Sequence, residues 1–107
     1  MAWTTLCDIS DMEECKGKYV EIGGFQLAVF LSDSNVYVMD NYCPHAGGNL
    51  AGGIVEEGCA VCPWHFWAFA LENGQLRDSP GVAVTTYKTR LLEDGGRKLV
   101  QADLPMY

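Results

Sequence analysis

The chain has 107 residues, of which 49% are hydrophobic and 20% charged, and its formal net charge is −7. This length predicts a single domain, residues 1–107, with enough chain to bury a hydrophobic core. The acidic balance argues against nucleic acid and against an anionic membrane surface, because both attract lysine- and arginine-rich patches. No apolar stretch approaches the ~20 residues of a membrane-spanning helix, and residues 1–8 do not resemble a signal peptide. We therefore expect a cytoplasmic protein.

The first part of the chain predicts strands separated by short turns. Strand-forming β-branched and aromatic residues gather in segments 3–9, 19–22, 25–31 and 36–40. Between the first two, residues 10–14 predict one helical turn that Ser10 caps. Gly23-Gly24 and residues 33–35 predict hairpin turns.

The second part of the chain shows the same pattern of short strands and turns. Residues 54–56 and 59–62 predict a hairpin around Glu57-Gly58, and Asn73-Gly74 marks a further hairpin turn after the apolar segment 66–71. The remaining expected elements are a tight loop at 78–81, an extended segment at 82–92, a turn at 93–96 and a strand at 97–102. No long segment has helical periodicity, so the predicted fold class is all-β, a small sandwich or barrel.

Two short motifs predict a metal site. Cys43-Pro44-His45 is followed by Cys62-Pro63-Trp64-His65, and these motifs contain both histidines of the chain. Thiolate and imidazole are preferred ligands of zinc and iron. The candidate ligands are Cys43, His45, Cys62 and His65.

Residue chemistry leaves several interpretations of these motifs. A single Zn²⁺ with two thiolates and two imidazoles is one, although zinc fingers usually place their histidines on a helix, and none is expected here. A Cys-x-x-Cys site at Cys59 and Cys62 leaves both histidines unexplained, and the two thiols would face opposite sides of a strand. We expect Cys7, Cys15 and Cys59 to be small buried or half-buried hydrophobic residues. The remaining interpretation is a [2Fe–2S] cluster.

The segments 41–50 and 62–65 resemble the ligand loops of Rieske-type [2Fe–2S] proteins, whose pattern is Cys-x-His followed by Cys-x-x-His. The similarity runs from Trp3 to the final hairpin. It implies stacked antiparallel sheets with a small cluster-binding subdomain built from two hairpin loops, within about residues 41–81. It also implies that Cys43 and Cys62 bind one iron of the cluster and that His45 and His65 bind the other. In this family a proline loop, similar to residues 78–81 here, covers the cluster.

Ligand charge and neighbouring positions bear on the reduction potential. Two thiolates neutralise the oxidised Fe₂S₂ core, whereas four would make it a dianion, so histidine ligation raises the potential to about −150 to +300 mV. High-potential relatives carry a disulfide where this chain has Gly48 and Trp64, and hydroxyl groups where it has Trp67 and Phe69. The resemblance therefore implies a low-potential member. Loss of an imidazole proton predicts a pH-dependent potential at alkaline pH.

One position departs from the family pattern. Many soluble members have glycine directly after the second histidine, whereas this chain has Phe66. Either this ring shields the cluster and reshapes the docking face, or it packs beside Trp67 on a rearranged loop. The sequence leaves both alternatives open.

The predicted function is that of an electron carrier and not of a catalyst acting alone. The chain shows no nucleophile–base pair and no nucleotide fingerprint. It resembles Rieske ferredoxins and the small subunit of NAD(P)H-dependent nitrite reductase. Residues 26–30 and 36–41 are more similar to the nitrite reductase subunit, whereas Trp64 is typical of the ferredoxins. The expected partners are an electron-donating reductase and an electron-accepting oxygenase or reductase subunit. The alternatives are a zinc-stabilised interaction module and a cluster with a structural or sensing role.

Overall fold

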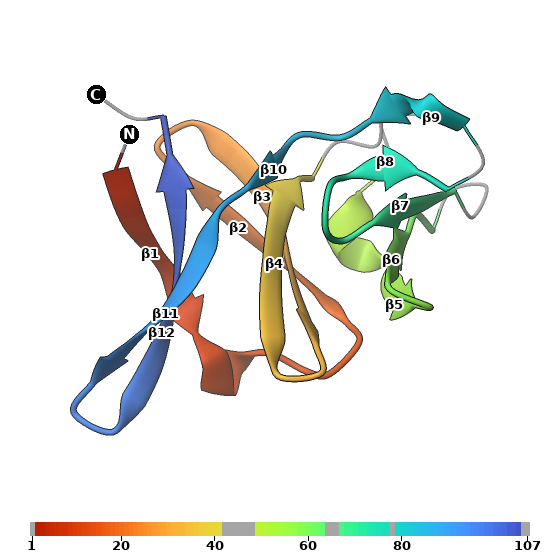
Figure 1. Ribbon diagram of the computed structural model, residues 1–107. Coiled ribbons are helices and arrows are strands. Elements are labelled where there is room, and N and C mark those ends of the chain that lie inside the picture. The colour runs from red at the N-terminus through yellow and green to blue at the C-terminus, as the bar shows by residue number, and fades with distance from the viewer. Residues whose placement is uncertain (1, 42–48, 64–66, 78, 106–107) are drawn as a thin grey trace.

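A computed structural model describes residues 2–41, 49–63, 67–77 and 79–105, with the backbone alone at Ala2, Ser79 and Pro80. Its strands form three antiparallel sheets that follow one another across the molecule (Figure 1). The central sheet has the order β10 (Thr86–Tyr87), β4 (Asn35–Asp40), β3 (Phe25–Ser32), β2 (Gly17–Ile22). The terminal sheet has the order β1 (Ala2–Asp8), β12 (Arg97–Leu104), β11 (Thr89–Asp94).

The third sheet, called here the short-strand sheet, has the order β5 (Ile54–Glu56), β6 (Cys59–Val61), β7 (Ala68–Ala70), β8 (Gln75–Leu76), β9 (Ser79–Ala83). Two 3₁₀ turns, η1 (Ile9–Asp11) and η2 (Leu50–Gly52), complete the described elements. This arrangement confirms the predicted fold class, stacked antiparallel sheets with a smaller sheet set apart on one side. No helix among the described residues is long and apolar enough to cross a membrane.

Strand β3 is buried on both of its faces. Leu27 and Val29 pack against terminal-sheet residues such as Val100. Ala28 and Phe30, which point the other way, pack in the core beneath the short-strand sheet. A strand between two cores needs apolar side chains at consecutive positions, which accounts for its unbroken apolar run.

The predicted hairpin turns are confirmed by backbone geometry. At the β2–β3 turn Gly23 and Gly24 have φ values of 56° and 85°, and at the β5–β6 turn Glu57 and Gly58 have 52° and 74°. Two successive positive φ values are typical of the type I′ turn, whose twist matches that of the flanking strands. These turns therefore fix the register of each hairpin.

Three local predictions were wrong. The helical turn begins earlier than expected, because Asp8 Oδ1 accepts a hydrogen bond from Ser10 N at 3.0 Å and caps Ile9–Asp11. Ser79–Ala83 form strand β9 where a tight loop was expected, because this segment pairs with β8. In the last hairpin, β11 extends to Asp94, so the turn is shorter than 93–96.

The short-strand sheet is joined to the central sheet through the backbone. Val55 N donates to Cys15 O at 2.8 Å, and Lys16 forms a bridge with Ile54. A methyl group built on Gly17 would lie 2.5 Å from Ala51 O, so β2 and η2 are in direct contact. These contacts place η2 and β5 against the central sheet, beside the segments that carry the candidate ligands.

Candidate metal centre

The second ligand segment follows strand β6. The Cys62 side chain is 0% exposed and packs in the same core as Leu50 and Phe69. Cys62 N donates to Trp67 O at 2.8 Å, which closes residues 63–66 at their base. The structure therefore places one predicted ligand in a dry environment at the end of a strand. Its predicted companion His65, and the positions of Trp64 and Phe66, lie outside the described residues.

The first ligand segment is closed in the same way, by Asn41. The carbonyl oxygen of this residue accepts from Leu50 N at 3.1 Å, and its side-chain Oδ1 accepts from Ala51 N at 2.7 Å. Asn41 N donates to Gln26 O at 2.9 Å, which ties the closure to β3. Cys43, His45 and Gly48 lie between these anchors and outside the described residues.

Described residues at one end of each segment lie next to each other. A methyl group built on Gly52, after the first segment, would lie 3.9 Å from Cγ of Pro63 in the second. One built on Gly53 would clash with the carbonyl oxygen of Val61, which brings the backbones of η2 and β6 into close approach. The end of the first segment therefore lies beside the start of the second, and each segment carries one cysteine and one histidine in its sequence. This arrangement fits a group that needs four ligands from two segments.

The other cysteines of the described chain are in unfavourable surroundings for metal binding. Cys59 is buried, and Cys7 and Cys15 are half-buried, as predicted. Burial raises the pKa of the Cys7 thiol, and burial followed by the Glu14 carboxylate raises the pKa of the Cys15 thiol. A raised pKa disfavours the thiolate that binds metals.

The Cys-x-x-Cys alternative receives no support from the described geometry. Cys62 and Ala60 belong to the core beneath the short-strand sheet. Cys59 instead lines a groove with Asp33 and Glu72 on another side of the sheet. Among the described residues, no three histidine, cysteine or acidic side chains gather as a metal site. The ligand set of Cys43, His45, Cys62 and His65 stays a prediction, because Cys62 alone of the four is described.

The surroundings of Cys62 are aromatic. Phe69 is fully buried in its core, and Trp67 packs against that core from a partly exposed position. Neither side chain carries a hydroxyl group that could donate to sulfur. Hydrogen bonds to the sulfur atoms are one of the means by which proteins raise a cluster potential. The lack of a hydroxyl group on Trp67 and Phe69 agrees with the expected low reduction potential. The potential itself stays a prediction.

Sequence reasoning missed a polar contact just before the first ligand segment. Tyr87 donates its hydroxyl to Asp40 Oδ1 at 2.7 Å, and Asp40 N donates to Thr85 O at 2.9 Å. Burial and then the Asp40 carboxylate raise the pKa of Tyr87. Asp40 adjoins Asn41, so β10 helps to hold the start of the ligand segment. No sequence signal links two residues that are 47 positions apart.

Solved structures share this architecture over nearly the whole chain. A protein described as an NADH-dependent nitrite reductase small subunit from Mycobacterium tuberculosis is 29% identical, with a TM-score of 0.83 and coverage of 98% of this chain and 97% of that one. A ferredoxin from Sphingomonas yanoikuyae B1 is 27% identical, also with a TM-score of 0.83, and the alignment covers 97% of this chain and 100% of that one.

A curated relative is similar in sequence but much longer. The cholesterol 7-desaturase nvd of Hemicentrotus pulcherrimus is 38% identical over 80 residues, which are 73% of this chain and 17% of the desaturase. The chain thus spans less than a fifth of the length of such relatives, the largest share being 19%.

The family comparison adds the identity of the cofactor to the geometry. The Rieske [2Fe–2S] domain family matches residues 2–88, which include both ligand segments and all of the short-strand sheet. Its cofactor is a [2Fe–2S] cluster, so the match favours this cluster over a single zinc ion. The buried Cys62 and the two adjacent closed segments fit such a group. The chain belongs to the Rieske [2Fe–2S] domain family.

Proposed function

We propose that this chain is an electron-transfer protein whose [2Fe–2S] cluster is held by Cys43, His45, Cys62 and His65. The observation that carries the proposal is the pair of adjacent closed segments, each with one cysteine and one histidine in its sequence. The cluster, when bound, accepts and returns one electron. The domain 1–107 then acts as one component of a multicomponent oxidoreductase.

The described residues around Cys62 contribute a buried and apolar environment. Cys62 is fully buried, and Phe69 and Trp67, which pack in or against its core, carry no hydroxyl group. Exclusion of water and the lack of a hydroxyl donor at these two positions both favour a low potential within this class. A low potential suits a carrier that passes electrons on to a stronger oxidant.

The partners that we propose are an electron-donating reductase and an electron-accepting oxygenase or reductase subunit. The similarity to a nitrite reductase small subunit and to a ferredoxin supports both kinds of partner. The net charge of −7 favours a basic docking patch on the partner and predicts association that weakens as salt is added. The free thiols of Cys7, Cys15 and Cys59 are compatible with the reducing cytoplasm that we propose as its location.

The first experiment is a metal and sulfide analysis of protein purified without oxygen. A brown protein with about two iron and two sulfide per chain and a Rieske-type electron paramagnetic resonance signal after reduction is expected. A colourless protein with one zinc ion would instead establish the zinc-stabilised module.

The second experiment tests the ligand set. His65→Cys should lower the reduction potential or prevent cluster assembly, because a third thiolate adds negative charge. Cys7→Ala is the matched control, since Cys7 lies half-buried in β1, and it should retain the native spectrum and potential. A native spectrum and potential in His65→Cys would exclude His65 as a ligand.

The third experiment separates the two partner classes. The reduced protein is mixed in turn with a Rieske oxygenase and with the catalytic subunit of a nitrite reductase, and its reoxidation is followed by absorbance. Fast reoxidation by one of them, slowed by added salt, identifies the partner class. A protein that neither a reductase reduces nor an acceptor oxidises would instead have a structural or sensing cluster.

A further inference from the structure

Asn41 is the point at which three parts of the fold meet beside the first ligand segment. Its N–H donates to Gln26 O in β3, its carbonyl oxygen accepts from Leu50 N, and its side-chain Oδ1 accepts from Ala51 N. The first bond reaches the central sheet and the other two reach η2. Asn41 therefore joins the beginning of the segment to its end and to a strand whose residues 27–30 are fully buried.

One of these three bonds depends on the identity of the side chain. The two backbone bonds would survive a substitution, whereas the bond from Ala51 N to Oδ1 would not. At 2.7 Å it is short for an N–H···O bond. Ala51 is 8% exposed and packs in the core with Cys62, so its N–H, if left unpaired, would carry the cost of a partly buried donor.

The η2 turn that this bond holds is confined on its other sides as well. Gly17 leaves no room for a side chain between β2 and Ala51 O, and Gly52 lies against Pro63 of the second ligand segment. A displacement of η2 would therefore alter the spacing of the two segments. The Asn41 side chain fixes η2 from the side of the first segment.

We propose that Asn41 is a positioning residue for the cluster, acting through its Oδ1–Ala51 bond to hold the two ligand segments at the separation that four ligands require. This inference rests on the proposed function, because it gives the Asn41 side chain a role in cluster retention. Residues that orient ligands without touching the metal typically change metal affinity about 10- to 100-fold when they are replaced.

The test compares three variants in the full chain. Asn41→Ala removes the acceptor, and Asn41→Asp keeps an oxygen at the same position. Asn73→Ala is the matched control, because Asn73 Oδ1 also accepts a backbone hydrogen bond, from Gln75 N at 3.0 Å, in the exposed β7–β8 turn. The measurements are the rate of iron release to a chelator, the visible circular dichroism and potential of the cluster, and the melting of the cluster-free protein.

Asn41→Ala should release iron about 10- to 100-fold faster than Asn73→Ala and should change the visible circular dichroism. Asn41→Asp should restore the native release rate. The cluster-free form of Asn41→Ala should melt somewhat below that of Asn73→Ala, because the Ala51 N–H loses its acceptor, but by less than the faster iron release would require. If Asn41→Ala does not fold, Asn41→Gln, which displaces the amide by one methylene, takes its place in the same comparison.

Equal rates of iron release from Asn41→Ala and Asn73→Ala would overturn the inference. Faster release from Asn41→Ala would also overturn it if Asn41→Asp released iron equally fast. A loss of stability in cluster-free Asn41→Ala that accounts for the faster release would show a purely structural role and would overturn it too. In each of these outcomes the unsubstituted protein still contains iron and sulfide. If the unsubstituted protein contained neither iron nor sulfide, the proposed function itself would be contradicted.

Discussion

The central and terminal sheets differ from the short-strand sheet in how they are held together. Strands β3 and β12 are eight residues long and are paired over most of their length. In the short-strand sheet, β5, β6 and β7 have three residues each and β8 has two. Long ladders on a shared core stabilise a sheet without specific side-chain contacts, whereas short ones depend on turns and close backbone approach.

This difference separates stability from function within one chain. The long strands supply most of the core between the central and terminal sheets, and they supply one side of the core beneath the short-strand sheet through Ala28, Phe30 and Met39. They carry none of the predicted ligands. The short-strand sheet positions Cys62 and depends on Asn41, Gly17 and Gly53 for its placement. Substitutions in the first region should lower stability, and substitutions in the second should release the cluster.

The largest effect is expected from Leu27→Ala in the central sheet. Leu27 is fully buried, and its removal leaves a cavity facing the terminal sheet, which should lower the free energy of unfolding by about 2–5 kcal/mol. Urea unfolding measures this, with exposed Leu92→Ala as the control. Below its melting temperature, Leu27→Ala should keep the native cluster spectrum. Loss of this spectrum in the folded variant would contradict the separation of stability and function between the two regions.

Gly53→Ala is the counterpart in the second region. Its new methyl group would clash with Val61 O, so the backbone must move, at a cost of about 1–3 kcal/mol. We expect weakened cluster binding, measured as iron per chain after purification. Gly96→Ala is the control, because its positive φ of 86° also strains the backbone while the residue lies in the β11–β12 turn of the terminal sheet. Equal iron content in the two variants would show that the close approach is unimportant.

Tyr87→Phe tests the junction between the two regions. Loss of the hydrogen bond to Asp40 should cost about 1 kcal/mol at neutral pH. Because the folded protein raises the pKa of Tyr87, the stabilisation is complete below the ordinary tyrosine pKa of about 10 and is lost as pH rises towards the folded value. The difference in melting temperature between native protein and Tyr87→Phe should therefore shrink above about pH 10.

Exposed Leu92→Ala, which changes no titratable group, is the control for this measurement. Its difference in melting temperature from the native protein should stay the same at every pH. A difference between native protein and Tyr87→Phe that persists unchanged at high pH would exclude the proposed contribution of the Tyr87 hydroxyl.

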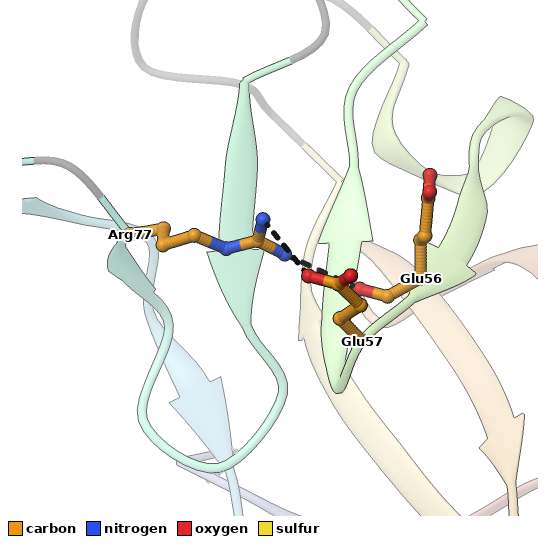
Figure 2. Close-up of polar contacts among 3 residues, drawn as sticks. All are labelled: Glu56, Glu57 and Arg77. Atoms are coloured by element: carbon orange, nitrogen blue, oxygen red, sulfur yellow. Dashed lines mark hydrogen bonds and ion pairs between the residues drawn. The ribbon is translucent and has the colours of Figure 1, made fainter.

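The smallest effect is expected from Glu57→Gln on the β5–β6 turn. Arg77 Nη1 lies 3.5 Å from Glu57 Oε2, and its Nη2 donates to Glu56 O at 3.4 Å (Figure 2). The Glu57 side chain is 77% exposed, so its ion pair should contribute less than about 0.5 kcal/mol and should weaken with salt. Thermal unfolding at low and high salt measures the contribution of this ion pair to stability, and Glu72→Gln is the control.

The all-β fold was predictable because its turns have local signatures. Gly23-Gly24 and Glu57-Gly58 determine two hairpins through two successive positive φ values each, and the sequence shows both. The assignment of strands to sheets was not predictable. Residues 82–92 were predicted as one extended segment, yet β10 joins the central sheet and β11 joins the terminal sheet.

The candidate site was predicted from chemistry that is concentrated in two short motifs, and its ligand set stays a prediction. Cys62, the predicted ligand that the structure describes, is fully buried. Its supports were not predictable, because they come from distant residues: Asp40 meets Tyr87, and Ala51 lies against Gly17. The β9 error has a different cause, because pairing with the preceding strand β8 outweighed the turn preference of proline and glycine.

The pairing of β1 with β12 has a practical consequence for how this domain can be joined to others. Ala2 lies opposite Leu104, and Figure 1 shows both ends of the described chain together on the side away from the short-strand sheet. A flanking polypeptide or an affinity tag attached at either end would therefore lie away from the short-strand sheet. The same geometry lets such a domain be inserted into a larger protein as a module, in keeping with the small share of the long relatives that it matches.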